Sequence, residues 1–251
     1  MGKLKGKRIL VAGSARNIGA KTAQRLVEEG AQVFLGDIDG EKVKAVAEQL
    51  GAGSQQFDLA DKESLENLVS AAVKHLGGLD GIANIAADIS PGTLGNDVDL
   101  LGMDTAIWEK TLNSNLIGYA LLIKHALPHL IESGSGSIVN ISSGSYFGGE
   151  PTRPAYAAAK AGVNTLTRHV ASRWGKDNIR CNAISPGMIV TETAGDLVSE
   201  EYMSKILRGV PRPLIGESKD IANGIAFFLS DEAEWITGQV LNINGGSAFR
   251  D

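Results

Sequence analysis

A serine, a tyrosine and a lysine in the stretch SSGSYFGGEPTRPAYAAAK have the types and spacing that proton transfer to a carbonyl oxygen requires. Tyr156 and Lys160 are four residues apart, so on a helix their side chains share one face. A free phenol, with a pKa of about 10, is a poor base at neutral pH, whereas a nearby ammonium favours the phenolate. At about 5 Å and an effective dielectric constant of about 20, the attraction is about 3 kcal/mol, equivalent to about two pKa units. Tyr156 is therefore the candidate acid and base.

Ser143 is the candidate hydrogen-bond donor to the same substrate oxygen. It ends an apolar, strand-like run thirteen residues before Tyr156. Its neighbour Ser142 is the alternative, because side chains alternate along a strand and only one of the two can face the site. The spacing to Tyr156 favours Ser143. The tyrosine and lysine alone are weak evidence, since a solvated lysine beside a half-buried ring has the same spacing on many helices.

A glycine-rich turn near the N-terminus, AGSARNIG, predicts a nucleotide-binding loop. Gly13 and Gly19 bracket a tight connection from a strand to a helix, where main-chain N–H groups and the helix dipole can hold a pyrophosphate. Asp37 ends the next expected strand, where a carboxylate can bind both hydroxyls of an adenosine ribose. Arg16, in contrast, could attract the extra phosphate of NADP. On balance the residues favour NAD.

These motifs, with four others, make the sequence resemble the short-chain dehydrogenase/reductase family over essentially its whole length. The others are LDGIANIAA, NSNLIG, NIRCNAISPG and ITGQVLNINGG, in the family's order and at its distances. The resemblance implies hydride transfer between NAD(H) and a secondary alcohol or ketone, with a catalytic set of Asn115, Ser143, Tyr156 and Lys160. Lys160 would lower the pKa of Tyr156 and bind the nicotinamide ribose. Asn115 would hold a water molecule that links Lys160 to solvent.

The resemblance also implies where the cofactor lies. Asp58 and Leu59 would contact the adenine, although capping or turn formation is the alternative role for Asp58. Thr191 would hold the carboxamide of the nicotinamide, with the same alternative. The full set implied for cofactor binding is Gly13, Arg16, Asn17, Ile18, Gly19, Asp37, Ile38, Asp58, Leu59, Asn84, Ala86, Tyr156, Lys160, Pro186, Gly187, Ile189 and Thr191.

The sequence departs from the family pattern around the cofactor. Ala12 replaces the usual threonine, and Asn17 replaces the usual middle glycine of the turn. Asparagine tolerates a positive φ better than other non-glycine residues, so we expect the turn to form. Ile85 and Ala87 replace asparagine and glycine after the fourth strand, so we expect the local hydrogen bonds to differ from the family pattern.

Apolar, strand-like runs alternate with amphipathic stretches along the chain. The runs are RILVAG, QVFLGD, SQQFDL, GIANIA, SIVNIS, IRCNAI and QVLNIN. The alternation predicts an α/β fold, a doubly wound, seven-stranded parallel sheet with helices on both faces (Rossmann-like). Ligands of such a sheet bind beyond the carboxyl ends of the strands. The irregular stretches 87–103, 144–154 and 187–215 follow three of these strands, so we expect them to wall the substrate pocket.

Composition indicates one globular domain over residues 1–251, with 43% hydrophobic and 21% charged residues and no linker-like stretch. A net charge of −5, with scattered Lys and Arg, argues against nucleic-acid partners and anionic lipid. No run approaches the ~18 apolar residues that span a membrane, and the N-terminus lacks a signal-peptide pattern. The single cysteine, Cys181, suits the cytoplasm, where we expect the protein to act on a small-molecule substrate.

A metal site is not expected, although His125 and His129 are four residues apart in KHALPHL. Pro128 should interrupt that helix, and no third ligand lies nearby in the sequence. The histidines are better interpreted as structural or solvated side chains.

Two other functions compete with an NAD-dependent alcohol dehydrogenase. A 3-oxoacyl thioester reductase would favour NADPH and a basic surface, which Asp37 and the acidic balance oppose. A dinucleotide-binding regulatory protein without activity would carry a broken catalytic set.

The substrate flap, about 187–215, is rich in Met, Ile, Leu and Val, which favours a moderately apolar or cyclic substrate. A family homotetramer is also expected, because the helix AYAAAKAGVNTLTRHVASRW is rich in small residues that let another helix approach closely.

Overall fold

Seven parallel strands form the central sheet in the order β3-β2-β1-β4-β5-β6-β9. The computed structural model describes residues 2–149, 151–190, 204 and 207–249. Its sheet strands are β1 (Arg8–Ala12), β2 (Gln32–Asp37), β3 (Gly53–Gln56), β4 (Gly81–Asn84), β5 (Gly136–Ile141), β6 (Ile179–Pro186) and β9 (Val240–Ile243). The predicted seven-stranded, doubly wound sheet is confirmed, because the order reverses direction at β1 and β4.

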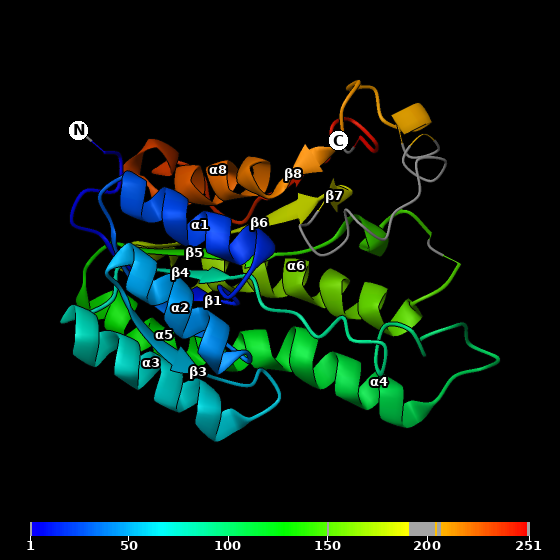
Figure 1. Ribbon diagram of the computed structural model, residues 1–251, viewed down its shortest axis with the longest axis horizontal. Coiled ribbons are helices and arrows are strands. Elements are labelled where there is room, and N and C mark those ends of the chain that lie inside the picture. The colour runs from blue at the N-terminus through cyan, green and yellow to red at the C-terminus, as the bar shows by residue number, and fades with distance from the viewer. Residues whose placement is uncertain (1, 150, 191–203, 205–206, 250–251) are drawn as a thin grey trace.

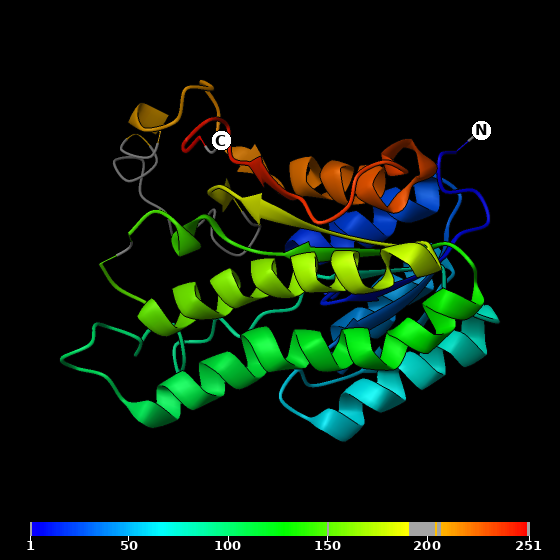
Figure 2. The same ribbon diagram turned by 180° about the vertical axis from the view of Figure 1, so that it is seen from behind.

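Helices cover both faces of the sheet, as Figures 1 and 2 show from opposite sides. One face carries α1 (Asn17–Glu28), α2 (Gly40–Leu50) and α8 (Ser218–Leu229). The other carries α3 (Lys62–Leu76), α5 (Gly118–Glu132) and α6 (Pro154–Trp174). A further helix, α4 (Thr105–Leu112), continues through a π-helical turn, η1 (Asn113–Ile117), into α5. The described part of the chain also contains short 3-10 turns, η2 (Gly144–Tyr146), η3 (Gly175–Asp177) and η4 (Asp231–Ala233).

Two hydrophobic cores explain why these strands form. Alternate residues of β1 enter different cores: Leu10 packs with α3 and α5, whereas Ile9 and Val11 pack with α1 and α8. Every residue of β5 is buried. Strands with both faces covered read as continuous apolar runs, which is why the sequence located them well.

The structure corrects the expected break at Pro128. Helix α5 runs through this proline from Gly118 to Glu132. A proline removes one main-chain hydrogen bond from a helix. Apolar packing of the buried face of α5, which includes Ile123, Leu127 and Leu130, outweighs that loss. The sequence patterns also did not predict the two-stranded sheet of β7 (Ile189–Val190) and β8 (Gly216–Glu217). Residues 191–203 and 205–206 of the expected flap lie outside the described residues.

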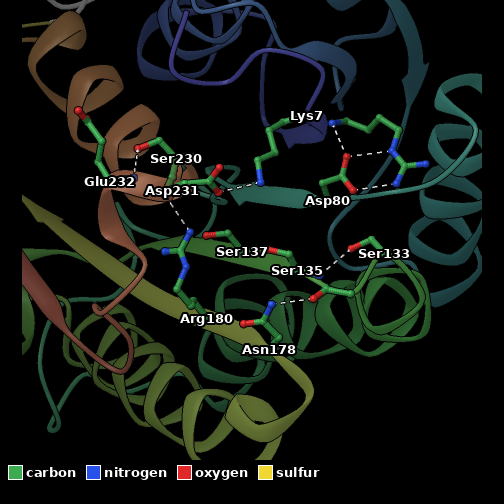
Figure 3. A network of polar contacts seen from close by, with 12 residues as sticks. Lys7, Asp80, Ser133, Ser135, Ser137, Asn178, Arg180, Ser230, Asp231 and Glu232 are labelled. Carbon is green, nitrogen blue, oxygen red and sulfur yellow. Dashed lines mark hydrogen bonds and ion pairs between the residues drawn. The ribbon is translucent and has the colours of Figure 1, made fainter.

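The amino ends of the strands are held by a polar network, shown in Figure 3. Arg8 donates to Asp80 from Nε at 2.9 Å and from Nη2 at 2.7 Å, and its main-chain N–H donates at 2.8 Å. Nearby, Arg180 donates to the carbonyls of Phe228 at 2.7 Å and Ser230 at 3.1 Å. This edge is opposite the one where ligands of such a sheet bind, so the network serves stability.

Arg8→Ala should lower the free energy of unfolding at neutral pH by about 1 to 3 kcal/mol, between the values for exposed and buried ion pairs. Burial opposes ionisation of Asp80, but its bonds to Arg8 outweigh this and hold its pKa below the usual range. The stabilisation is therefore complete above the unfolded pKa of about 4 and is lost as pH falls through the lower folded pKa. Urea unfolding at pH 7 and pH 3 measures both effects.

Lys3→Ala is the matched control, because Lys3 forms an exposed pair with Glu232 on the same side of the molecule. It should change stability little at either pH. Equal losses for Arg8→Ala and Lys3→Ala would contradict the importance given to the Arg8–Asp80 pair.

Candidate active site

The carboxyl ends of the strands bring the predicted site residues to one edge of the sheet. Gly13 directly follows β1, Asp37 and Asn84 end β2 and β4, and Ser143 follows β5 by two residues. Ser143 lies beside Tyr156 of α6, which also carries Lys160. This edge is where ligands of doubly wound sheets bind.

Lys160 is fully buried and lies against two aromatic rings. Its Nζ is 5.7 Å from the ring centroid of Tyr156 and donates to the carbonyl of Ile141 at 2.9 Å. The second aromatic ring against Lys160 belongs to Tyr119 on α5, and its centroid lies 4.8 Å from the Lys160 Nζ. The Tyr119 hydroxyl donates to the same Ile141 carbonyl at 3.4 Å. No sequence pattern indicated Tyr119, because its contact with Lys160 depends on how α5 packs against α6.

Burial dominates the electrostatics of the pair. It lowers the pKa of Lys160 to about 7 and raises the pKa of the Tyr156 phenol above its usual value. A hydrogen bond with Ser143 and the charge of Arg153 act in the opposite direction on the Tyr156 pKa, but more weakly. The expected lowering by about two units is therefore not found. Attraction between the Lys160 ammonium and the Tyr156 phenolate lowers the pKa of the phenol only while Lys160 is charged. The cost of removing both groups from water opposes it.

The two adjacent serines have different surroundings. Ser142 is buried, and its hydroxyl donates to the main-chain carbonyl of Lys160 at 3.4 Å. Ser143 is only partly buried, and its Oγ accepts from the N–H of Ser145 at 3.3 Å. Ser143 is thus the serine next to the Tyr156 phenol, and Ser142 belongs to the interior.

Asn115 lies in the π-helical turn η1 and is completely buried. Its Oδ1 accepts from the N–H of Asp88 at 3.0 Å, and its Nδ2 donates to the carbonyl of Asp88 at 3.0 Å. Both ends of the amide are thus bound to the main chain of Asp88. A water molecule at Asn115 would more readily bind its main chain, since π-turns disturb the regular helical hydrogen bonds.

The glycine-rich turn has the geometry that a pyrophosphate needs. A Cβ on Gly19 would lie 1.7 Å from the carbonyl oxygen of Gly13, and Gly13 itself has φ of +93°. Asn17 has φ of +50°, the left-handed conformation expected for it. At the N-cap of α1, the Arg16 side chain makes no capping hydrogen bond, and the first turn contains no acidic residue. The N-terminus of α1 thus suits an anion, and the residues fit a dinucleotide.

The Asp37 carboxylate is held firmly beside this turn. Its Oδ2 accepts from the N–H of Ala15 at 2.8 Å, and its Oδ1 accepts from the N–H of Asp39 at 3.1 Å. Arg16 forms an ion pair with Asp39 at 2.7 Å, and Lys42 pairs with the same carboxylate at 3.3 Å. The arginine expected to attract an extra phosphate is therefore already matched by a carboxylate.

The remaining predicted cofactor residues have varied surroundings. Asn84 is buried, and its Nδ2 donates to Asn140 at 2.9 Å, so this amide nitrogen is engaged in the interior. The Asp58 carboxylate accepts from the N–H of Ala60 at 2.8 Å, which is the turn role considered above. Ile38 is 64% exposed. Partly buried positions are Ile18, Ala86, Pro186, Gly187 and Ile189; Leu59 is buried, and Thr191 lies outside the described residues.

The departures after β4 leave the backbone tightly bound to the turn. The N–H groups of Ile85 and Ala86 both donate to the carbonyl of Ala12 at 2.8 Å. A Cβ at Gly13 would lie 2.3 Å from the nitrogen of Ala86. Main-chain bonds therefore replace the side-chain hydrogen bonds that a second asparagine would make.

Within the described ranges, no three His, Cys, Asp or Glu side chains are grouped as metal ligands. Over the same residues, no helix is long and apolar enough to cross a bilayer.

The chain is similar in sequence to several known proteins. A sequence model described as enoyl-(acyl carrier protein) reductase matches residues 12–248. The chain is 32% identical to 7alpha-hydroxysteroid dehydrogenase of Bacteroides fragilis, over 98% of this chain and 96% of that protein. It is 37% identical to 2,5-dichloro-2,5-cyclohexadiene-1,4-diol dehydrogenase of Sphingobium indicum, over 97% of each. It is 35% identical to 3-oxoacyl-(acyl-carrier-protein) reductase of Staphylococcus aureus, over 96% of this chain and 97% of that protein.

A solved structure of a short-chain type dehydrogenase/reductase from Mycobacterium ulcerans superposes with a TM-score of 0.90. It is 28% identical, and the match covers 97% of this chain and 90% of the other.

Proposed function

The chain belongs to the short-chain dehydrogenase/reductase family, as its motifs predicted, and on that premise we propose that it transfers a hydride between NAD(H) and a secondary alcohol or ketone. The observation that carries the proposal is the placement of Tyr156 beside Ser143 and Lys160, at the sheet edge that also holds the glycine-rich turn. A moderately apolar or cyclic substrate is favoured, because two of the relatives are named for steroid and cyclohexadienediol substrates.

The proposed mechanism assigns one task to each side chain. A bound nicotinamide supplies the hydride acceptor for oxidation or the donor for reduction. Tyr156 takes the proton from the alcohol hydroxyl, or returns it to the carbonyl oxygen, and Ser143 donates a hydrogen bond that fixes this oxygen. Lys160, when charged, favours the phenolate and binds the nicotinamide ribose. Asn115 holds the η1 turn and a water molecule that connects Lys160 to solvent.

For the cofactor itself, we propose that the first turn of α1 holds the pyrophosphate and that Asp37 holds the adenosine ribose. Ile38, Asp58 and Leu59 line the adenine end. Asn84, Ala86, Pro186, Gly187, Ile189 and Thr191 complete the predicted set toward the nicotinamide.

Activity toward a panel of alcohols tests the proposal. Cyclic, aliphatic, steroid and sugar alcohols are each mixed with the protein and NAD, and NADH absorbance is followed. We expect turnover of cyclic or apolar secondary alcohols, and none with boiled protein. Turnover of polyols alone would contradict the apolar substrate class, and no turnover in either direction across the panel would contradict the proposed dehydrogenase.

A 3-oxoacyl thioester reductase is the second candidate, because the matching family description and one 35% identical relative refer to acyl-carrier-protein substrates. Reduction of a 3-oxoacyl thioester with NADPH, faster than any alcohol oxidation with NAD, would favour it.

The Tyr119 ring gives a test of how Lys160 keeps its charge. Removal of the ring in Tyr119→Leu takes away the cation–π contact that favours the ammonium. Lys160 should then be charged only at lower pH, so the Tyr156 phenolate should form only at higher pH. We expect the rise of alcohol oxidation with pH to move upward by about one unit. Tyr119→Phe keeps the ring and should leave the profile in place; one common profile for both variants and the parent would contradict this role.

We also propose a cytoplasmic homotetramer, in keeping with the family and with the buried, unpaired Cys181. The outer side of α6 carries Ala158 exposed and Ala161 partly exposed, small residues that let another helix approach closely. Light scattering at micromolar concentration should report four chains. A monomer would refute the assembly and leave the enzyme proposal intact.

A further inference from the structure

The catalytic helix α6 receives its N-terminal cap from a distant loop. Its own N-cap residue, Arg153, has φ of +64° and makes no side-chain capping bond, and Pro154 has no N–H to donate. Asp97 supplies the missing acceptors. Its Oδ1 accepts from the N–H of Ala155 at 3.2 Å, and its Oδ2 accepts from the N–H of Tyr156 at 3.0 Å.

Asp97 is only 4% exposed, and its main chain is also engaged. Its carbonyl accepts from the N–H of Arg153 at 2.7 Å. A buried carboxylate is costly unless hydrogen bonds and positive charge compensate it, and the N-terminus of a helix supplies both. Asp97 is therefore held closely against the residues that begin α6.

The same loop is bound to Asn115 at its other end. Asn115 holds the main chain of Asp88 through two hydrogen bonds of 3.0 Å. The hydroxyl of Thr93, which is completely buried, donates to Asp88 Oδ1 at 3.0 Å. The carbonyl of Thr93 accepts from the N–H of Asp97 at 3.1 Å. Hydrogen bonds thus run without interruption from Asn115 through Asp88, Thr93 and Asp97 to Tyr156.

We propose that residues 88–97 form a strap that fixes the position of Tyr156 relative to Asn115, and that Asp97 is a positioning residue for catalysis. The inference rests on the proposed function, because it assumes that Tyr156 carries the proton. Asp97 acts on the main chain of Tyr156 and has no role in the chemistry itself. The strap also links the loop after β4, which lies beside the site, to the helix that bears the phenol.

Position matters here because proton transfer requires the phenol oxygen within hydrogen-bond distance of the substrate oxygen. A displacement of about 1 Å at a reacting group can cost about 100-fold in rate. Loss of the Asp97 bonds frees the first turn of α6, on which Tyr156 stands. Among the described residues, the hydrogen bonds of Asp97 lead to Thr93 and to the start of α6 rather than to the cofactor turn after β1, so cofactor binding should change little.

The test compares Asp97→Asn and Asp97→Ala with Asp104→Asn as the matched control. Asp104 follows the same stretch of chain, is exposed, and accepts a bond from the N–H of Ala106 on α4 rather than from α6. We expect kcat for alcohol oxidation to fall about 10-fold in Asp97→Asn and up to about 100-fold in Asp97→Ala. KM for NAD and the dissociation constant for NADH, measured by fluorescence, should stay within about twofold. Asp104→Asn should match the parent.

Hydrogen exchange gives a second reading that does not depend on turnover. Amides of residues 155–160 should exchange faster in both Asp97 variants than in Asp104→Asn, while those of α3 and α5 keep their protection. Thr93→Val, which removes the middle link, should show the same pattern more weakly.

The outcomes separate the two proposals. Normal kcat and normal exchange in Asp97→Asn would overturn the strap, even if Asp97→Ala fails to fold. Faster exchange at 155–160 with normal kcat would also overturn the positioning role. If the parent protein shows no turnover at all, the proposed function fails, and the exchange result alone then decides whether Asp97 holds α6.

Discussion

Tyr156→Phe should remove nearly all turnover while leaving NADH binding close to that of the parent protein. The change deletes the hydroxyl that carries the proton and keeps the ring that packs beside Lys160. General acid–base catalysis contributes about 100- to 10,000-fold, so we expect kcat to fall by about 1,000-fold or more. The measurements are NADH absorbance for turnover and fluorescence for binding.

Tyr119→Phe is the matched control, because it also removes one buried phenol hydroxyl while keeping the ring that contacts Lys160. It should keep most of the activity. Substantial activity in Tyr156→Phe, with normal folding by circular dichroism, would show that another group moves the proton.

The rate of alcohol oxidation should also rise with pH in the parent protein, because the phenolate is the base. Burial raises the pKa of Tyr156 in the protein alone, so the rise should begin only on the alkaline side unless Lys160 is charged. A flat profile from neutral to alkaline pH, with chemistry rate-limiting, would count against Tyr156 as the base.

Much of the fold was accessible from sequence because the signals are local. The central strands β1, β2, β4, β5 and β6 are largely buried and appear as apolar runs, and a parallel sheet with crossovers leaves few possible orders. The same holds for Asn17, whose positive φ follows from its place in a glycine-rich turn. The break expected at Pro128 was wrong, because packing of α5 in the core overrides a local rule about proline.

What the sequence could not give depends on long-range packing. Asp97 caps a helix that begins 57 residues later, and Tyr119 meets Lys160 only after α5 and α6 pack. The sequence signal was the absence of Ser, Thr, Asp or Asn at the N-cap position of α6, and this absence does not point to Asp97. The balance between burial and attraction at Tyr156 likewise requires the surroundings of both groups.

We also expect a large difference between the catalytic efficiencies with NAD and with NADP, and a large effect of Asp37 on that difference. The parent protein should use NAD at least about tenfold more efficiently than NADP. A phosphate of about −1.5 charges, roughly 5 Å from the Asp37 carboxylate, costs about 5 kcal/mol at an effective dielectric constant of 20. Solvent screening that halves this still leaves about 2.5 kcal/mol, and an exposed arginine returns only about 0 to 1 kcal/mol.

The surroundings of Arg16 strengthen the preference for NAD. Arg16 is paired with Asp39 at 2.7 Å, so binding a phosphate would require this pair to be exchanged or shared. Asp37 is fixed by two main-chain N–H groups and cannot easily turn away from the ribose. Both carboxylates therefore act against an extra phosphate.

Asp37→Ala should narrow the gap between the cofactors by about tenfold or more, chiefly by lowering the KM for NADP. NAD should bind more weakly in the same variant, because two ribose hydroxyls lose their acceptor. Asp177→Ala, which removes an exposed carboxylate just before the amino end of β6, controls for the general loss of a negative charge. Ratios of kcat/KM for NAD and NADP, measured with one alcohol, give the result. Equal efficiencies in the parent protein would mean that Asp37 only holds the turn together, since its bonds to Ala15 and Asp39 would then be its whole role.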